Sequence, residues 1–277
     1  MNKPRASARR AARRVRVGIG GWTYAPWRNN FYPEKLVQRL ELEYASRQLR
    51  TIEINGTFYR AQKPATYAKW AAQTPTDFVF SIKAPRYIVQ AAHLGQTGTR
   101  ISAFLHGGLA ELGDRLGPIL WQLPASRPFD ADDLAAFMEA LPRELDGQPL
   151  RHALEVRDAS FLDARYVALA RAHRVATVFT DSPDAPSLAD LTGEFVYARL
   201  KQSVDKISTG YSAAALDRWA LQAREWAAGN DAAPLPHADT VQTPAPPRDV
   251  FVFFIGAAKQ RNPAAAIALQ ARVDGAD

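Results

Sequence analysis

Two hydrophobic patterns alternate along the chain. In short runs apolar and polar residues alternate, which is typical of β-strands, and in longer stretches apolar residues recur every three or four positions, which is typical of amphipathic helices. We expect strands at 16–22, 51–58, 77–84, 117–123, 152–157, 174–181, 194–201 and 249–256. We expect helices at 34–49, 64–73, 100–115, 130–141, 163–173, 212–228 and 263–273.

The order of these elements predicts a single-domain α/β fold, a (β/α)8 barrel of the TIM type. Pro33-Glu34, Pro64 and Pro263 fit first-turn positions of helices, and Asp130 and Ser212 fit N-caps. Only 182–193 separate the sixth and seventh strands, so we expect a single turn of helix there, or none. The alternative is an open doubly wound sheet, which normally needs fewer strands; no Gly-x-Gly-x-x-Gly follows the first one.

Polar residues share one face at the carboxyl ends of four predicted strands. The opposite face stays apolar and must contact the helices, because a charge there would be buried without water. The polar face therefore points into the barrel, at the end where TIM-type barrels keep their sites. The strand residues of this face are Glu53, Asn55, Ser81, Lys83, Glu155, Arg157, Tyr197, Arg199 and Lys201, and we expect Gln122 and Asp181 to join them. The alternative is a set of buried ion pairs that only fix the barrel.

The charges at this predicted barrel mouth favour an anionic ligand. Five cations, including Lys259 after the last strand, face three carboxylates, which gives a net charge of +2. Arginine is suited to bidentate contact with a phosphate or carboxylate, so we expect an anionic small molecule as the partner.

Aromatic residues are dense near the same end. Trp22, Tyr24, Trp27, Phe31 and Tyr32 follow the first strand, and Phe58 and Tyr59 end the second. On a barrel rim such side chains stack on a sugar face or a nucleobase. Trp22, Tyr24 and Tyr59 are therefore candidate ligand contacts, together with Asn55. The alternative is that most of these rings plug the barrel or pack against the first helix.

Glu53 and Glu155 are the candidate catalytic pair. Two carboxylates across a cleft serve as general acid and base in glycosidases, and they could also bind Mg²⁺ or Mn²⁺. Each has a basic candidate partner, however, and a salt-bridged glutamate is ionised and unsuited to be an acid. No Gly-x-Ser-x-Gly, Walker or His-Glu-x-x-His motif is present.

Composition limits the remaining possibilities. The chain has 277 residues, no cysteine and five histidines without ligand spacing, so we expect no metal and no cofactor. No apolar run approaches the ~18 residues of a membrane span, and we expect a cytoplasmic protein. Residues 229–248 contain five prolines and are expected to form a surface loop.

The net charge of +7 belongs to one end of the chain. Seven of the 35 Lys and Arg lie in residues 1–16, and the other 28 equal the number of Asp and Glu. We expect residues 1–14 to be a disordered basic tail, dispensable for folding, because few of its side chains are apolar. Such a tail also makes nucleic acid a possible partner.

Five sequence motifs, in order, resemble one known family. They are GGWTYAPWRNNFYP, TIEINGTFY, the segment from Trp70 to Arg86 ending in FVFSIKAPR, GPILWQLP and LEVRD. Together they resemble domain of unknown function 72, the YecE-like family, over about residues 15–272. The resemblance implies a TIM-type barrel without an established activity. Residues that match its motifs are Trp22, Tyr24, Trp27, Glu53, Asn55, Tyr59, Lys83, Gln122, Pro124, Glu155, Arg157 and Arg199.

The chain departs from the family pattern in two places. Arg-x-His-Gly is common after the seventh strand, whereas this chain has ARLKQS, with Lys201 in place of the histidine. An Asn-Asn-Asp-like segment often ends the last strand, whereas this chain has FFIGAAKQR. If histidine and aspartate carry chemistry in other members, this chain has lost or replaced it.

Three hypotheses follow: an enzyme acting on an anionic sugar or nucleotide-like compound, a non-catalytic binding protein, or a nucleic-acid-associated protein. A strongly raised pKa of Glu53 or Glu155 favours the enzyme. Full pairing of the charges in the pocket favours the binding protein, and a basic track leading out of the barrel favours nucleic acid.

Overall fold

Eight parallel strands close into a barrel in the computed structural model, which describes residues 12, 14–231, 234–240 and 245–275. Around the barrel the order is β1, β10, β9, β8, β7, β4, β3 and β2. The barrel strands are β1 (Val15–Gly20), β2 (Thr51–Ile54), β3 (Val79–Lys83), β4 (Leu116–Gln122), β7 (His152–Glu155), β8 (Ala176–Thr180), β9 (Phe195–Leu200) and β10 (Asp249–Phe254). The predicted TIM-type barrel is confirmed.

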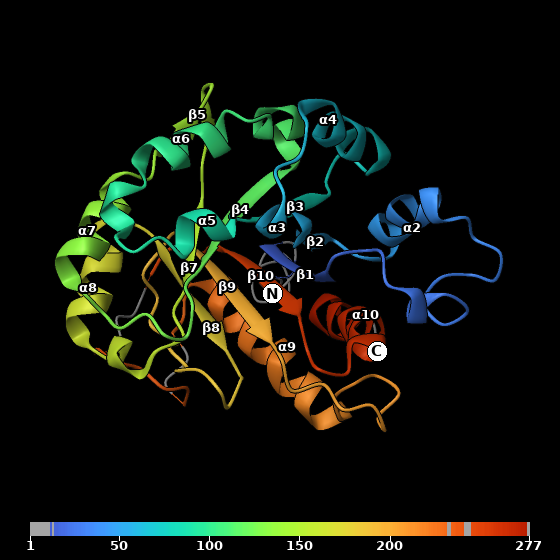
Figure 1. The fold of residues 1–277 in the computed structure, drawn as a ribbon. Helices are drawn as coiled ribbons and strands as arrows, with labels where there is room; N and C mark the ends of the chain where they lie inside the picture. Colours follow the sequence, from blue (N-terminus) through green and yellow to red (C-terminus); the bar gives the residue numbers. More distant parts are fainter. Residues whose placement is uncertain (1–11, 13, 232–233, 241–244, 276–277) are drawn as a thin grey trace, which may run out of the picture.

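Helices surround the strands as an outer ring (Figure 1). The α-helices are α2 (Glu41–Gln48), α3 (Gly56–Tyr59), α4 (Pro64–Gln73), α5 (Arg86–Val89), α6 (Gly98–Leu105), α7 (Ala131–Glu139), α8 (Ala164–Ala172), α9 (Ala213–Ala228) and α10 (Asn262–Asp274). The 3-10 helices are η1 (Ala25–Trp27), η2 (Gln38–Leu40), η3 (Leu94–Gln96), η4 (Leu109–Arg115), η5 (Ala159–Phe161) and η6 (Lys259–Arg261). None of the helices in the described part of the chain is both long and apolar enough to cross a membrane.

The alternation of the strands divides the core into two. Outward-facing residues such as Ile52, Ile82 and Leu154 pack with the helices in one large cluster. Inward-facing residues such as Leu120, Tyr197 and Phe253 form a separate cluster inside the barrel. Because side chains alternate along a strand, the next inward positions toward the carboxyl ends belong to the polar residues.

The crossover from β8 to β9 contains a turn but no helix, as the length of 182–193 predicts. The outer face of β8 is covered by α9 instead, where the ring of Phe179 lies 5.5 Å from Trp219 and 5.6 Å from Trp226. The pairing of β8 with β7 is also short, with Ala153 opposite Ala176 and Leu154 opposite Thr177.

Three predicted elements were wrong in part. The second strand ends at Ile54 and not at 58, because the chain turns there into α3. The helix predicted at 34–49 begins at Glu41, since Lys35 has a φ of 68° and Val37 is extended. The helix predicted at 100–115 is divided between α6 and η4 at Gly108, whose φ is 119° and where a Cβ would lie 2.7 Å from Pro64.

Among the short elements that were not predicted is a β-hairpin. A two-stranded sheet of β5 (Glu144–Leu145) and β6 (Gln148–Pro149) precedes β7. Its turn is Asp146-Gly147, and both residues have positive φ, at 50° and 78°. Asp-Gly is the standard sequence of such a hairpin turn, so the signal was present in the chain.

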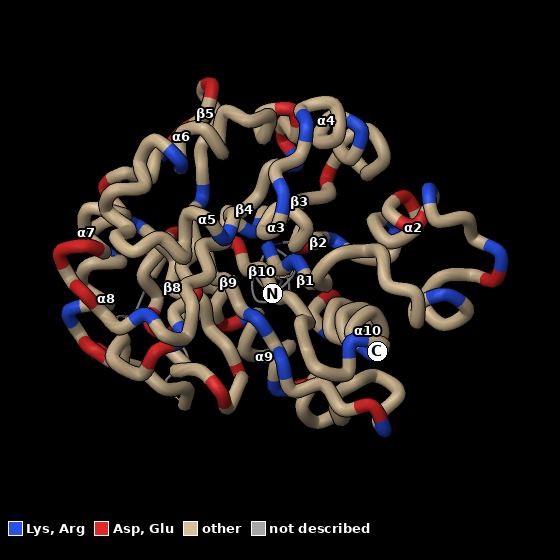
Figure 2. Tube along the Cα trace, viewed as in Figure 1, with Lys and Arg blue, Asp and Glu red and all other residues tan. Residues whose placement is uncertain are grey.

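The predicted basic tail falls mostly outside the described residues. Of residues 1–14 the structure describes Ala12, which is buried, and Arg14, whose guanidinium lies 3.8 Å from the Asp249 carboxylate. The proline-rich segment 229–248 is described in part. There Ala238 and Asp239 donate backbone hydrogen bonds to Asp190, at 2.9 and 3.0 Å. Over the outer helices, acidic and basic positions are interspersed (Figure 2).

Candidate functional site

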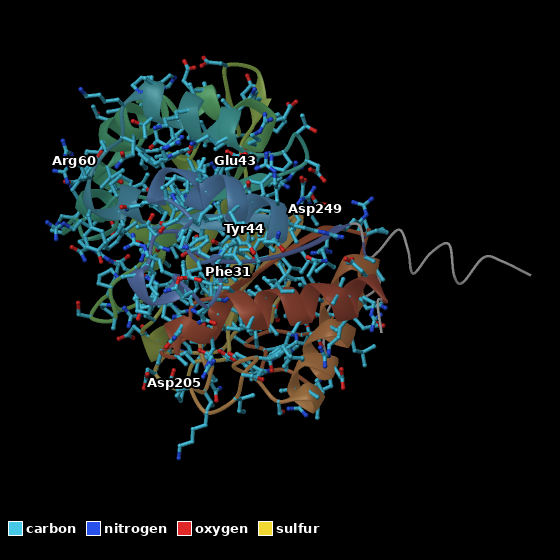
Figure 3. The ribbon with its side chains drawn as sticks, turned by 90° about the vertical axis from the view of Figure 1, so that its right-hand side faces the viewer. Phe31, Glu43, Tyr44, Arg60, Asp205 and Asp249 are labelled. Atoms are coloured by element: carbon cyan, nitrogen blue, oxygen red, sulfur yellow. The ribbon has the colours of Figure 1, made fainter. Side chains whose placement is uncertain are left out.

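A cavity of about 690 Å³ lies at the carboxyl ends of the strands. Figure 3 views the barrel from the side. Arg60 and Asp205, which follow β2 and β9, lie at one end of the molecule, and Asp249, the first residue of β10, lies at the other, so the first end is the one where the strands finish. The cavity is lined by Gly20, Gly21, Trp22, Thr23, Ile54, Asn55, Gly56, Tyr59, Gln62, Trp70, Lys83, Gln122, Arg157, Arg199, Lys201, Phe254, Ile255, Gly256, Lys259 and Asn262. None of these lining residues is Asp or Glu.

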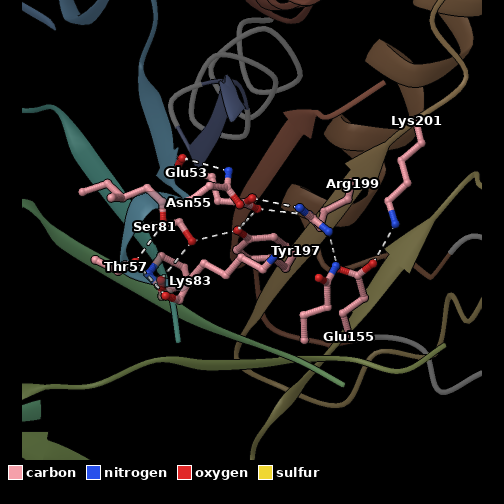
Figure 4. Close-up of polar contacts among 12 residues, drawn as sticks. Glu53, Asn55, Thr57, Ser81, Lys83, Glu155, Tyr197, Arg199 and Lys201 are labelled. Atoms are coloured by element: carbon pink, nitrogen blue, oxygen red, sulfur yellow. Dashed lines mark hydrogen bonds and ion pairs between the residues drawn. The ribbon is translucent and has the colours of Figure 1, made fainter. Parts of the chain in front are cut away.

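Arg199 forms the floor of the cavity and binds two glutamates beneath it (Figure 4). Its Nε and Nη2 donate to the Glu53 carboxylate at 3.1 and 2.9 Å, and its Nη1 donates to Glu155. Glu53 and Glu155 are both 0% exposed, and Arg199 is 2% exposed. One guanidinium therefore joins β2, β9 and β7 across the inside of the barrel.

Further donors complete the pairing of both carboxylates. Tyr197 donates to Glu53 at 2.7 Å, while the Gln122 amide and the Lys201 ammonium donate to Glu155 at 2.8 and 2.7 Å. Every oxygen of the two carboxylates thus accepts at least one hydrogen bond. Ser81 adds a hydrogen bond of 2.7 Å to the Tyr197 hydroxyl.

The pKa of Glu155 is set by its burial and by the cations that contact it. Burial alone would raise the pKa of Glu155, but Arg199 and Lys201 outweigh it and lower that pKa to about 2. Glu155 is consequently ionised at neutral pH. Burial also opposes the charge of Arg199, yet the two glutamates raise the pKa of its guanidinium.

Three other cations reach the cavity without a carboxylate partner among the described residues: Lys83, Arg157 and Lys259. The Arg157 Nε is buried and has no hydrogen-bond partner in the described structure. Burial and the charge of Arg199 lower the pKa of Lys83 to about 8. Burial also lowers the pKa of Lys259, whose ammonium lies 4.5 Å from the ring centre of Tyr24.

The remaining wall is aromatic and partly apolar. Trp22 and Trp70 both line the cavity, with ring centres 5.1 Å apart in an edge-to-face arrangement. Tyr59 lines the rim and is 71% exposed. A cavity with cations at its floor and rings at its side is suited to an anion attached to a flat or partly apolar body.

The sequence was compared with known families and proteins. Residues 16–277 match the family model described as "Protein of unknown function DUF72". The chain belongs to this family.

Solved DUF72 structures share the fold at low sequence identity. A crystal structure of a DUF72 family protein from Thermotoga maritima is 21% identical, with a TM-score of 0.68 over 92% of this chain and 96% of that one. A DUF72 family protein from Enterococcus faecalis is 16% identical, with a TM-score of 0.65 over 94% and 95% of the two chains. No curated protein matches this chain in sequence.

This DUF72 protein brings most of the predicted site residues to one cavity. Those that line it are Trp22, Asn55, Tyr59, Lys83, Gln122, Arg157, Arg199, Lys201 and Lys259. Glu53 and Glu155 lie under Arg199 and do not line it. No group of three or more His, Asp or Glu in the described part of the chain is placed to hold a metal ion.

Two predicted residues are directed elsewhere in the DUF72 barrel. Asp181 accepts hydrogen bonds from the Lys201 backbone at 2.6 Å and from the Tyr211 hydroxyl at 3.0 Å, and it is not among the lining residues. Tyr24 packs against Trp27 at 5.4 Å, so its ring belongs to the first-loop cluster. Trp27 and Tyr32 are buried in that cluster too, which confirms the packing alternative for them.

Sequence reasoning missed several residues that complete the site. Trp70 lies on α4 and Asn262 begins α10, and both line the cavity. Neither sits on a strand, so strand alternation gave no signal for them. Tyr197 was placed on the polar face by the strand pattern but was not chosen as a site residue, although it donates to Glu53.

Proposed function

We propose that this protein binds a small organic anion, a phosphate- or carboxylate-bearing sugar or nucleotide-like compound, in the cavity at the carboxyl ends of its strands. One observation carries the proposal: five cationic side chains line the cavity, and none of the described lining residues is acidic. Arg199 and Lys201 are neutralised by the glutamates below, whereas Lys83, Arg157 and Lys259 have no carboxylate partner in the described structure.

Lys83, Arg157 and Lys259 are half-buried at the cavity wall. A partly desolvated cation without a counter-charge costs free energy, which an incoming anion would recover. Arg157 supplies the planar donor group that matches a phosphate or carboxylate, and its Nε is buried without a hydrogen-bond partner among the described residues. Trp22 and Trp70 would contact the uncharged part of the ligand.

The proposal assigns Glu53 and Glu155 to holding Arg199 and Lys201 and not to proton transfer. A general acid must carry a proton at working pH, whereas the pKa of Glu155 is lowered to about 2. Both carboxylates are also covered from the cavity. The pairing supports binding ahead of glycosidase-like catalysis.

Calorimetry with inorganic phosphate and ribose 5-phosphate tests the proposal, with ribose as the neutral control. We expect inorganic phosphate and ribose 5-phosphate to bind and ribose not to bind. At a ligand concentration of one hundred times Kd, the free energy of unfolding should rise by about 2.7 kcal/mol. Arg157→Gln should weaken binding by about tenfold or more, because a charged hydrogen bond contributes about 1.5–3 kcal/mol. The exposed Arg218→Gln is the matched control. Absence of binding, or equal affinity in Arg157→Gln, contradicts the proposal.

A second candidate function is the binding of single-stranded nucleic acid. It is favoured by a second cavity, of about 590 Å³, which shares Trp22, Thr23 and Trp70 with the first. The described cations that line this second cavity are Arg39, Lys63 and Lys69, and none of its lining residues is acidic. A basic groove beside aromatic rings, on which bases can stack, is the usual arrangement for binding single strands.

Fluorescence anisotropy with labelled single-stranded DNA and RNA tests this second function. We expect affinity to fall steeply with salt and to drop in the double variant Lys63→Gln, Lys69→Gln. Deletion of residues 1–14 separates the two possible contacts, since binding that survives it must come from the barrel. A lack of binding at low salt would exclude this function.

A further inference from the structure

Lys83 stands apart from the other cations of the cavity. It ends β3, lines the cavity, and has no ion pair or side-chain hydrogen bond to any described residue. Its ammonium lies 4.2 Å from the ring centre of Phe58. Thr57, next to Phe58, donates a hydrogen bond of 2.7 Å to the Lys83 carbonyl oxygen, which fixes the end of the strand beside that ring. Figure 4 shows this contact together with the Arg199 network.

We propose that Lys83 is a nucleophile that forms an imine with an aldehyde or ketone bearing a phosphate or carboxylate group. The inference rests on the proposed anion binding, because Arg157 and Lys259 would hold the acidic group in the same cavity as the Lys83 amine. It goes further in naming a carbonyl compound as the ligand and covalent bond formation as the activity.

The surroundings of Lys83 favour its neutral, nucleophilic form. Burial is the largest cause of the lowered pKa of Lys83, and the positive charge of Arg199 is the second. The charges of Glu53 and Glu155 raise that pKa, and Lys201 lowers it by a smaller effect. With a pKa of about 8, about a tenth of the amine is neutral at pH 7, against about one in 3000 at the ordinary value of 10.5. The Phe58 ring favours the charged form and opposes these effects in part.

The other two lysines of the cavity are less suited to this role. The Lys201 amine is engaged by the Glu155 carboxylate at 2.7 Å and is not free to attack a ligand. The Lys259 ammonium lies over two rings, 4.5 Å from Tyr24 and 5.6 Å from Trp27, and both favour the cation. Lys83 therefore combines access to the cavity with an amine that no carboxylate of the described residues holds and that contacts a single ring.

The reaction balances without a further reagent. The neutral amine attacks the carbonyl carbon and forms a C–N bond, while the carbonyl oxygen takes a proton from water in the cavity and becomes a hydroxyl. The nitrogen returns one proton to the hydroxide formed from that water, which gives a neutral carbinolamine. It then loses its second proton as the carbinolamine hydroxyl takes a proton and leaves as water. The products are the C=N bond and one water.

Reductive trapping tests the inference. The full-length protein is incubated with pyruvate or glyceraldehyde 3-phosphate, reduced with cyanoborohydride, and analysed by intact mass and peptide mapping. We expect one adduct per chain, located on Lys83, with a rate that rises along a midpoint near pH 8, since this is where Lys83 loses its proton. Lys83→Arg keeps the positive charge but should give at least about tenfold less adduct. The exposed Lys206→Arg is the control and should label like the wild type.

The outcomes separate this inference from the function beneath it. If phosphate binds but no adduct forms, or if the adduct is spread over surface lysines, the nucleophile is overturned and anion binding stands. If an adduct forms on Lys83 in a protein that does not bind phosphate, the nucleophile is supported and the anion requirement fails. If neither occurs, both are wrong.

Discussion

Arg199 illustrates how a charge is kept inside a barrel. An isolated guanidinium there would cost several kcal/mol in lost hydration. All three of its nitrogens instead donate to Glu53 or Glu155, and these carboxylates in turn accept from Tyr197, Gln122 and Lys201. Removing Glu155 would leave Lys201 without a carboxylate among the described residues and Arg199 with only one, in a place that water reaches poorly.

Glu155→Ala should therefore lower the free energy of unfolding by about 3–5 kcal/mol, because Arg199 and Lys201 both lose a counter-charge. Arg157→Ala, two residues after Glu155 in the chain, is the matched control for Glu155→Ala. It removes a cation without an acidic partner and should cost little stability or raise it. Urea unfolding of both variants measures the difference. Equal losses would mean that Arg157 also has a structural role.

The lowered pKa of Glu155 predicts that the free energy of unfolding depends on pH. The pKa of Glu155 is lowered to about 2 in the folded state, against about 4.3 in the unfolded chain. A lowered pKa contributes stability above the unfolded value, and this contribution is lost as pH falls from about 5 to about 2. The free energy of unfolding should fall by about 3 kcal/mol over this pH range.

Urea unfolding across this pH range, on the wild type and Glu155→Gln, checks that pH dependence. The variant should start less stable at neutral pH but lose less on acidification. Glu194→Gln, at an exposed glutamate, should follow the wild type. Parallel curves for the wild type and Glu155→Gln would contradict the assignment.

At the scale of elements, the close approach of β1 and β2 depends on a glycine. A Cβ on Gly18 would lie 1.9 Å from the Thr51 carbonyl oxygen, a backbone atom of the neighbouring strand. We expect Gly18→Ala to cost about 2 kcal/mol or more, since strands must separate to admit the methyl group. Gly56→Ala is the control, because a Cβ there meets nothing within 4 Å and alanine favours α3. Thermal unfolding of the two variants compares these costs.

Sequence alternation predicted strands better than it predicted helices. It placed Glu53, Lys83 and Arg199 on the inner face, because a period of two leaves a strand little freedom once its apolar face is known. It could not predict that Asp181 would be captured by Tyr211 and the Lys201 backbone, since that depends on how distant segments meet. The divided helix at Gly108 has the same cause, a close approach to Pro64 from elsewhere in the chain.

At the scale of the whole molecule, folding should not depend on metal. Carboxylates are the main candidate ligands in a chain without cysteine, and the two inside the barrel are already occupied by cationic donors. A structural metal would add its binding free energy to the stability of the folded state, so its removal by EDTA would lower the melting temperature. We expect no such metal, and therefore a shift of less than about 1 °C on addition of EDTA. Elemental analysis of the purified protein is the direct measurement. A stoichiometric transition metal would refute this expectation.

The short pairing between β7 and β8 gives the closed barrel a preferred seam. Two residue pairs join these strands, and the crossover that follows β8 has no helix of its own, so that α9 packs on Phe179 from outside instead. Amide protons of β8 should therefore exchange with solvent through local openings of lower free energy than those needed in β1 or β10. No residue of β8 lines the cavity, so a ligand would not protect this seam directly. Local openings of the barrel should therefore begin between β7 and β8, while β3, which carries Lys83, stays paired with β2 and β4.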